Sequence, residues 1–223
     1  MIRLGKWQDV LADVETCDAV ICDPPYGARA HNADGARADG LAPTYAHWMP
    51  TEVTEFLASW TPRCTGWIVA LTCSDLAPVF RDSFFAHGWY GFAPIPCVIR
   101  GMSVRLAGDG PSSWAVYAVA GRPRTRAMAM WGTLDGAYVG PAQRGAGGGR
   151  GKPRWLMDGL VRDYSRAGDL VVDPFAGWGS TAISALGLDR RFLGAEMDAD
   201  ARDEALRRLG RGQQRDLFAS GAA

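Results

Sequence analysis

Four consecutive residues near the start of the chain combine an acid, a fixed backbone carbonyl and an aromatic ring. Asp23-Pro24-Pro25-Tyr26 follows the apolar run 18–22, which predicts a short buried strand that two prolines cannot continue. Asp23 then stands at a strand end as a hydrogen-bond acceptor, the prolines fix the direction of the Pro24 carbonyl, and Tyr26 offers a face for stacking. An isolated D-P-P-Y is also typical of a rigid turn with a capping Asp.

A second set of residues, late in the chain, is typical of a site for a ligand with a ribose. The segment 171–181 predicts a strand, a turn with Gly177 and Gly179, and a helix whose first N–H groups face the turn. The next strand ends at Glu196, 19 residues after Gly177, where a carboxylate can accept both ribose hydroxyls. The alternative is a tight turn followed by an ordinary surface glutamate.

Together the two sets resemble the motifs of amino-group DNA methyltransferases. The turn resembles their S-adenosylmethionine motif D-P-F-x-G-x-G-[ST]-T, and D-P-P-Y resembles their catalytic motif for the exocyclic amine of adenine. The resemblance implies S-adenosyl-L-methionine as cofactor, no metal, and the catalytic residues Asp23, Pro24, Pro25 and Tyr26. The cofactor-binding residues that it implies are Asp173, Phe175, Ala176, Gly177, Gly179, Glu196, Lys152 and Trp7.

The resemblance also assigns positions along the cofactor. It implies that Asp173 lies near the methionine end, that Glu196 holds the ribose, and that the helix from Lys152 touches the methionine part. Members of the family often carry Gly-Asp early in the chain, with the Asp close to the adenine, whereas this chain has Gly-Lys-Trp there. Trp7 stacking on the adenine and Asp9 contacting it are two substitutes that the sequence leaves unranked.

The residue types suit methylation of an aromatic amine. Such an amine is a poor nucleophile because its lone pair is delocalised into the ring. If Asp23 and the Pro24 carbonyl each accept one N–H, the nitrogen is drawn toward a tetrahedral, nucleophilic geometry. A base within a duplex must be flipped out, or supplied single-stranded, to reach such a site. Methylation of cytosine C5 would need a catalytic cysteine, and the five cysteines are typical of small buried hydrophobes.

Alternating strand and helix patterns predict an α/β fold. We expect strands near 18–22, 66–71, 90–99, 114–119, 170–172 and 191–195, and helices near 52–60, 75–86, 153–168, 180–186 and 199–209. The resemblance implies a Rossmann-like methyltransferase fold, with a mostly parallel seven-stranded sheet between two helical layers. The catalytic motif precedes the cofactor motif, as in the circularly permuted β-type enzymes. We expect one domain, 1–223, with a catalytic half (1–99), a short DNA-facing segment (about 100–151), a cofactor half (152–209) and a tail (210–223).

The charge of the chain is zero overall but unevenly distributed. Residues 100–166 carry 11 basic and 4 acidic side chains, so this segment is the candidate surface for a polyanion such as DNA. The DNA-contact candidates are Arg105, Arg122, Arg124, Arg126, Arg144 and Arg150. The chain start lacks the apolar core of a signal peptide, and the apolar runs are too short for a membrane span. We therefore expect a cytoplasmic protein, monomer or homodimer, similar to short phage and restriction-modification enzymes.

Alternatives to adenine-N6 methylation of DNA remain. A cytosine-N4 methyltransferase is the first, although Ser usually replaces the Asp of D-P-P-Y there. A catalytically silent DNA-binding protein with the same fold is the second. In the tail, Gln214-Arg215-Asp216-Leu217-Phe218 resembles the short extended peptide by which bacterial replication proteins dock on the sliding clamp. Leu217 and Phe218 covering the protein's own core is the equal alternative.

Overall fold

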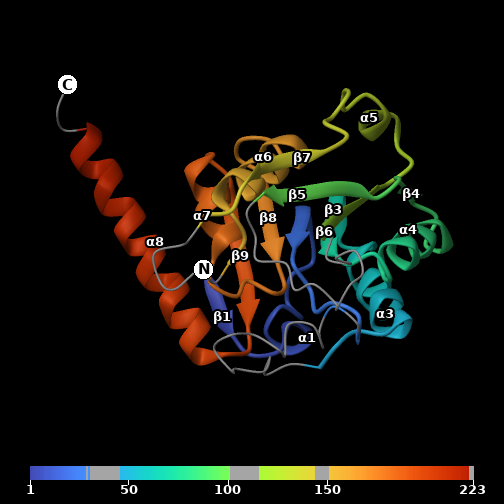
Figure 1. Cartoon of the computed structure of the whole chain (residues 1–223), viewed down its shortest axis with the longest axis horizontal. Coiled ribbons are helices and arrows are strands. Elements are labelled where there is room, and N and C mark those ends of the chain that lie inside the picture. Colours follow the sequence, from blue (N-terminus) through green and yellow to red (C-terminus); the bar gives the residue numbers. More distant parts are fainter. Residues whose placement is uncertain (29, 31–45, 101–115, 144–150, 221–223) are drawn as a thin grey trace, which may run out of the picture.

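One mixed β-sheet forms the centre of the computed structural model (Figure 1). The structure describes residues 1–28, 30, 46–100, 116–143 and 151–220, with 212–220 described as helical backbone only. Within these residues the sheet has nine strands, in the order β1-β9-β8-β2-β3-β6-β5-β7, with β4 also paired to β6. The strands are β1 (Ile2–Leu4), β2 (Cys17–Cys22), β3 (Cys64–Thr72), β4 (Tyr90–Gly91), β5 (Ile95–Arg100), β6 (Val116–Arg122), β7 (Tyr138–Pro141), β8 (Leu170–Asp173) and β9 (Arg191–Glu196).

The expected α/β fold with a mostly parallel sheet is confirmed. Strands β1, β9, β8, β2 and β3 are parallel, and β6 runs antiparallel between β3 and β5. The expected number of seven strands is wrong. The described residues form nine strands. The sequence does not reveal β1, β4 and β7 because they are two to four residues long, too short for a readable alternation of apolar and polar residues.

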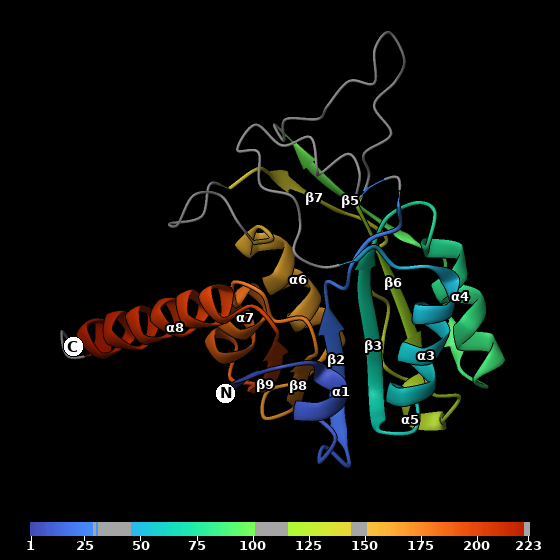
Figure 2. The ribbon, with the colours of Figure 1, turned by 90° about the horizontal axis from the view of Figure 1, so that it is seen from below.

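Helices cover both faces of the sheet (Figures 1 and 2). One face holds α1, α3 and α4, and the other holds α6, α7 and α8. The helices are α1 (Trp7–Val10), α3 (Pro50–Trp60), α4 (Ala77–Ala86), α5 (Arg126–Ala129), α6 (Arg154–Tyr164), α7 (Ser180–Gly187) and α8 (Ala199–Ser220). None of the helices in the described part of the chain is long and apolar enough to cross a bilayer.

Alternation along the strands builds the two layers of the core. In β2, Ala19 and Ile21 enter the cluster beneath α6 and α7, whereas Val20 and Cys22 enter the cluster beneath α3 and α4. All four are fully buried, which explains why the sequence reads as a continuous apolar run. All five cysteines of the chain are buried and free, which confirms that they pack as small hydrophobes.

Strand order brings the two motif regions together. β2 pairs with β8 in parallel, with Ala19 opposite Val171 and Val20 opposite Val172. Because parallel strands end at the same edge of a sheet, Asp23 and the turn after Asp173 emerge side by side. This edge, beyond the carboxyl ends of the strands, is where open α/β sheets bind ligands.

The last helix is longer than the sequence predicted. We expected it to end near the glycines at 210–212, with an extended tail, whereas α8 continues to Ser220. The expectation was wrong because glycine weakens a helix by only about 1 kcal/mol per residue, and the residues that follow include the good helix formers Gln, Arg, Leu and Ala. Gln214 to Phe218 therefore lie in a helix rather than in an extended peptide, and their side chains are outside the described residues.

Gly179, in the glycine turn between β8 and α7, packs closely against α8. Its φ is 76°, and a Cβ there would lie 2.9 Å from the Cβ of Ala205 on α8. We expect Gly179→Ala to lower the free energy of unfolding by about 1–3 kcal/mol, through left-handed strain and overpacking. Urea denaturation measures the change. Gly210→Ala is the matched control, because no atom lies within 4 Å of its Cβ position and alanine favours a helix. Equal stability of the two variants would contradict the account.

Candidate active site

The D-P-P-Y residues leave β2 at the sheet edge and are anchored on both sides. The Tyr26 carbonyl accepts a hydrogen bond from the Trp48 N–H at 3.0 Å, and the next N–H, of Gly27, donates to Cys73 Sγ at 3.4 Å. Tyr26 is buried, whereas the Asp23 side chain is 30% exposed. Its Oδ1 is buried and has no hydrogen-bond partner among the described residues. A buried acceptor without a partner is uncommon in folded proteins.

Lys152 is the cation at this carboxylate. Its Nζ donates to Asp23 Oδ2 and lies 5.2 Å from the centroid of the Tyr26 ring. The two partners are 129 residues apart in the chain, and they meet because β7 returns to the edge at which α6 begins. The resemblance implied that Lys152 faces the cofactor, whereas in this structure the Lys152 ammonium binds Asp23.

The glycine turn follows β8, the strand next to β2, and lies at the same edge of the sheet as Asp23. The Ala176 N–H donates to the Ala195 carbonyl at 2.8 Å, and the Gly177 N–H donates to Glu196 Oε2 at 2.7 Å. Gly177 has a φ of 49°, in the left-handed region that favours glycine, and a Cβ there would be in ordinary contact with the Phe175 carbonyl oxygen at 3.8 Å and with Glu196 Oε2 at 4.0 Å. These features fit a nucleoside-bearing cofactor such as S-adenosylmethionine, with Glu196 at its ribose.

Asp173, at the end of β8, is 1% exposed and sits below this turn. Its Oδ1 accepts a hydrogen bond from the Phe175 N–H at 2.9 Å, and Thr181 hydrogen-bonds to the carboxyl group. Burial raises the pKa of Asp173 to about 7, further aided by the nearby Asp23 and Glu196 charges and opposed by the two hydrogen bonds. The folded protein therefore retains a proton on Asp173 at mildly acidic pH.

This raised pKa predicts a pH dependence of stability. Between about pH 4 and 7 the unfolded chain releases the Asp173 proton while the folded chain keeps it, so stability falls as pH rises through this window. Relative to Asp173→Asn, wild type is expected to lose up to about 4 kcal/mol of unfolding free energy across it, and nothing further above pH 7. Urea denaturation from pH 4.5 to 8 tests this. The exposed Asp82→Asn serves as a control with no such trend, and a pH-independent difference for Asp173→Asn would refute the assignment.

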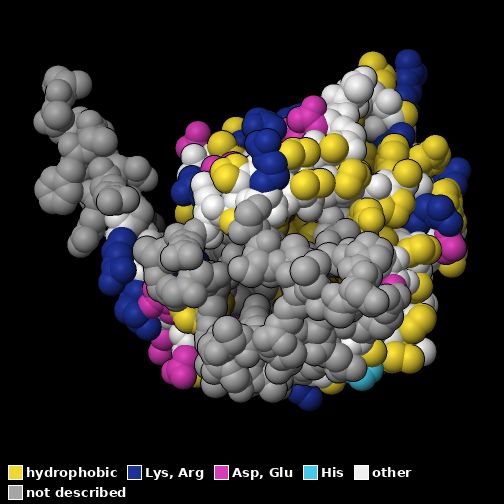
Figure 3. Space-filling view, in the orientation of Figure 1, with side chains coloured by type: hydrophobic (Ala, Val, Ile, Leu, Met, Phe, Trp, Pro, Cys, Tyr) yellow, Lys and Arg dark blue, Asp and Glu magenta, His cyan; other side chains and the backbone are white. Residues whose placement is uncertain are grey.

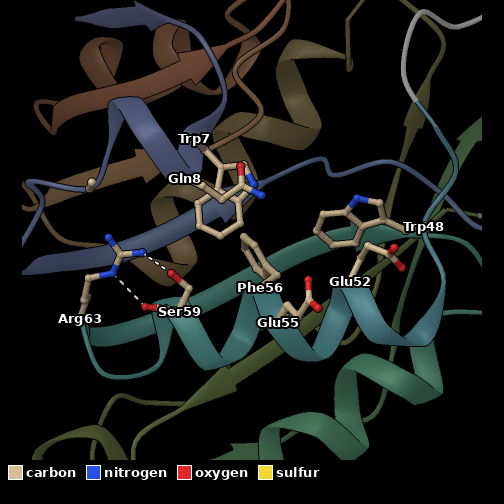
Figure 4. A pocket seen from close by; sticks show the side chains of 9 residues that line it. Trp7, Gln8, Trp48, Glu52, Glu55, Phe56, Ser59 and Arg63 are labelled. Carbon is tan, nitrogen blue, oxygen red and sulfur yellow. Dashed lines mark hydrogen bonds between the residues drawn. The ribbon is translucent and has the colours of Figure 1, made fainter.

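An aromatic cluster joins the cofactor turn to α1 and α3. Phe175 lies with its ring centroid 6.4 Å from Trp7 and 5.3 Å from Trp48. Beside this cluster an open pocket of about 540 Å³ lies between the two helices (Figure 4). Its lining residues are Trp7, Gln8, Ala12, Trp48, Glu52, Glu55, Phe56, Ser59 and Arg63. Trp7 is among them and Asp9, which is exposed, is not; because the lining includes neither glycine of the turn nor Glu196, the residue that would lie next to an adenine ring stays a prediction.

The three DNA-contact candidates that the structure describes, Arg122, Arg124 and Arg126, lie away from Asp23. Arg105, Arg144 and Arg150 are outside the described residues. Arg122 ends β6, which runs antiparallel to β3: Tyr117 pairs with Thr72 at the carboxyl end of β3, and Gly121 pairs with Ile68 at its middle, so Arg122 points toward the amino end of β3. In Figure 2, β2 and β3 point to the upper edge, whereas α5, which begins at Arg126, lies at the lower edge. The described candidate arginines are therefore at the sheet edge opposite Asp23.

Aromatic rings hold two of these arginines. The Arg122 guanidinium lies 5.5 Å from the Tyr90 centroid and 5.6 Å from the Phe92 centroid, and Arg124 lies 5.6 Å from Tyr90. On the face shown in Figure 3, lysine and arginine side chains of the described residues occur in separate groups with acidic side chains between them. The basic side chains of the described residues do not gather into one patch on that face.

Comparison with known proteins gives a family for part of the chain. The model of a family described as DNA methylase matches residues 146–207, which include Lys152, the glycine turn and Glu196. Curated relatives align over similar lengths: Type II methyltransferase M1.MboII of Moraxella bovis is 44% identical over 54 residues, and DNA adenine methyltransferase YhdJ of Escherichia coli is 38% identical over 58 residues. These alignments span 24% and 26% of this chain, and only 21% and 20% of those relatives.

Solved structures show a similarity of fold that covers nearly the whole chain and is not limited to residues 146–207. M1.HpyAVI in complex with SAM matches 94% of this chain and 98% of its own, with a TM-score of 0.70 and 18% identity. TTHA0409 of Thermus thermophilus, complexed with S-adenosyl-L-methionine, matches 95% and 94%, with a TM-score of 0.66 and 20% identity. The cytosine-N4-specific PvuII DNA methyltransferase also matches, covering 91% and 83% with a TM-score of 0.62 and 13% identity. The fold is therefore that of DNA methyltransferases, and it does not distinguish adenine from cytosine.

The structure adds residues to the candidate site that sequence reasoning missed. Trp48 links the D-P-P-Y strand end to the aromatic cluster, Thr181 supports Asp173, and the Asp198 N–H donates to Glu196 Oε1 at 2.8 Å. The sequence could have indicated Thr181, because it is the last residue of the motif D-P-F-x-G-x-G-[ST]-T. No sequence pattern indicates Trp48, because it follows a long polar stretch and belongs to no motif.

Proposed function

We propose that this chain transfers the methyl group of S-adenosylmethionine to the N6 amine of adenine in DNA. The observation that carries the proposal is the shared sheet edge. Asp23, whose side chain is 30% exposed, leaves β2 beside the turn of Gly177, which leaves the neighbouring strand β8. An amine acceptor and a cofactor cradle side by side are what direct transfer between two bound molecules requires.

The chain's own residues would act by holding and orienting. Asp23 and the Pro24 carbonyl accept the two N–H bonds of the target amine, and Tyr26 provides a face against the base. Glu196 and the glycine turn hold the cofactor, which supplies an electrophilic methyl group when bound. Asp23 accepts the proton that the amine loses, directly or through water. No described group of His, Cys, Asp and Glu side chains has the arrangement of a metal site, and direct transfer needs none.

Three features support adenine over the alternatives. The intact acid at position 23 is typical of adenine-specific members of the family that the motifs resemble, whereas Ser is usual in cytosine-N4 enzymes. Two relatives bear names that state or imply DNA methylation, and one of them names adenine. Asp23, Tyr26, Gly177, Gly179 and Glu196 are all present, which argues against a silent DNA-binding protein. The motif order also supports the permuted β-type arrangement as part of this proposal.

The first test is transfer of a tritiated methyl group. The purified chain, with labelled S-adenosylmethionine, is offered DNA free of methylation, total RNA or bulk protein. We expect label in DNA alone. Label in RNA or protein only, or binding of DNA without any transfer, would overturn the proposal.

DNA would approach the sheet edge that carries Asp23, so basic side chains far from this edge should contribute little to DNA affinity. The sequence expectation was that Arg122 and Arg124 contact phosphates, which would flatten the salt dependence of DNA affinity by one to two units on removal. Because both lie at the opposite sheet edge and against aromatic rings, we expect Arg122→Ala with Arg124→Ala to change that slope by less than about half a unit. Fluorescence anisotropy at several salt concentrations measures the slope, and a drop of one unit or more would restore the original assignment.

A sliding-clamp role for Gln214 to Phe218 stays a prediction. Helical backbone at these residues would have to unwind before the peptide could bind in extended form. Deleting residues 213–223 and measuring clamp binding and methylation of free DNA separately tests it.

A further inference from the structure

The paired parts of β5 and β7, residues 97–100 and 138–141, form a two-stranded ribbon that extends past the sheet edge at which Asp23 lies (Figure 2). Ile95 at the start of β5 and Leu71 near the end of β3 both pair with Ala118 of β6. β5 therefore begins at the level at which β3 ends. The β5–β7 ribbon lies beyond the carboxyl ends of β2 and β3, on the side from which a substrate would reach Asp23.

The β5–β7 ribbon also lies close to the candidate site. Burial raises the pKa of the Cys97 thiol on β5 to about 11, and the nearby charges of Lys152 and Asp23 act on this pKa in opposite directions. Electrostatic effects of this kind weaken with distance, so both charged groups are near the start of the ribbon. A large substrate whose base is bound at Asp23 would therefore lie beside the β5–β7 ribbon.

The inner side of the β5–β7 ribbon is fixed against α6. The Tyr138 ring packs on Gly159 of α6, where a Cβ would lie only 2.9 Å from the ring. The Trp155 ring covers Gly140 so closely that a Cβ there would overlap it, and its Nε1–H donates to the Pro141 carbonyl at 2.8 Å. These contacts hold a strand of four residues in one position from one side only.

The outer side of the β5–β7 ribbon is exposed and largely apolar. Because side chains alternate along a strand, Val98 and Arg100 of β5 share this side with Val139 of β7. Val98 and Val139 are paired in register and are 47% and 54% exposed. Figure 3 shows hydrophobic side chains at the surface over β5 and β7. The ribbon thus presents two neighbouring valines, with the exposed Arg100 at its end.

Duplex DNA is the occupant that this position and chemistry favour. The major groove is wide enough for a two-stranded β-ribbon, and the thymine 5-methyl group is its apolar feature. An adenine flipped out of a duplex leaves its thymine partner in the opposite strand, so a methyl group is present at the target whatever the recognition sequence. An arginine at the end of such a ribbon is suited to a neighbouring phosphate.

We propose that Val98 and Val139 are specificity-determining residues that contact a thymine methyl group in the major groove at the target adenine. The inference rests on the proposed function and names a part of the DNA surface. It differs from the sequence expectation, which assigned DNA contact to arginines. Contacts to phosphates position a protein on DNA, whereas an apolar contact to the thymine methyl group distinguishes one base from the others.

DNA without thymine methyl groups tests the inference without a known target sequence. Unmethylated duplexes are amplified with either thymine or uracil, which pairs with adenine but lacks the methyl group, and kcat/KM for tritium transfer is compared. Wild type should prefer thymine DNA by about 3–10-fold. Val98→Ala combined with Val139→Ala should lower transfer to thymine DNA and bring the preference to within about 1.5-fold of equality, because the partner of the methyl group is gone.

Controls separate the possible failures. Met130→Ala removes a side chain that is 75% exposed next to α5, at the opposite edge, and should keep the wild-type preference. Circular dichroism confirms folding, and Val98→Thr with Val139→Thr, which keeps the β-branches, replaces the alanine variant if that is unfolded. Transfer to neither DNA means that the proposed function fails. Equal wild-type transfer to both DNAs overturns only the inference.

The other possible occupant of the valines is a second copy of this chain. Sedimentation of wild type and the valine variant distinguishes it. A wild-type dimer that the valine variant dissociates, together with an unchanged preference for thymine DNA, would overturn the inference and assign the outer side of the β5–β7 ribbon to a subunit interface. Unchanged sedimentation together with a lost preference is the result that we expect.

Discussion

Asp23→Ala is expected to reduce methyl transfer at least about 10²–10³-fold while binding of S-adenosylhomocysteine is retained. The reason is positional: Asp23 leaves β2 with its carboxylate toward the place of the target amine, and the contacts that hold the glycine turn come from other residues. Tritium transfer to DNA measures the first quantity, and isothermal calorimetry measures the second.

The matched control is Asp82→Ala, an exposed carboxylate on α4 that pairs with the neighbouring Arg81. It should leave both transfer and binding unchanged. Transfer by Asp23→Ala within about tenfold of wild type would remove Asp23 from the chemistry. Loss of S-adenosylhomocysteine binding by a folded Asp23→Ala protein would instead place it in the cofactor site.

Glu196→Gln is expected to weaken cofactor binding by about 1–3 kcal/mol, a rise in Kd of roughly 5- to 150-fold. Both carboxylate oxygens already accept a backbone N–H, Oε2 from Gly177 and Oε1 from Asp198, so the group is fixed at the mouth of the turn. Loss of its charge removes charge-assisted bonds to the ribose and loosens the turn itself.

Calorimetry with S-adenosylmethionine tests this, and saturating cofactor should largely restore transfer. The control is Glu15→Gln, an exposed glutamate in the turn before β2. An unchanged Kd in the Glu196 variant would mean that the cofactor does not reach the end of β9.

The sequence was informative where a local pattern determines the geometry. The apolar run before Asp23, the glycines of the cofactor turn and the strand ending at Glu196 each predict their own strand, turn or acid position. The register of β2 against β8 then confirms that these elements lie on neighbouring strands. Features of this kind can be predicted from sequence because a strand end and a positive-φ glycine depend on only a few consecutive residues.

Strand direction was not available from the same patterns. Arg122 ends β6 and Arg124 and Arg126 follow it, and because β6 runs antiparallel to β3 these three arginines leave the sheet at the far edge from Asp23. Nothing in the composition of that segment records which way β6 runs. The pairing of Lys152 with Asp23 is hidden for a similar reason, because it depends on β7 returning to the edge across a glycine-rich stretch that predicts no strand.

The modified base is the most direct test of the central claim. Unmethylated DNA is incubated with the protein and S-adenosylmethionine carrying a deuterated methyl group, then digested to nucleosides and analysed by mass spectrometry. The account predicts deuterated N6-methyladenine, produced by wild type and missing from the Asp23→Ala reaction. Deuterated N4-methylcytosine with no N6-methyladenine, or no labelled nucleoside at all from a protein that binds the cofactor, would contradict it.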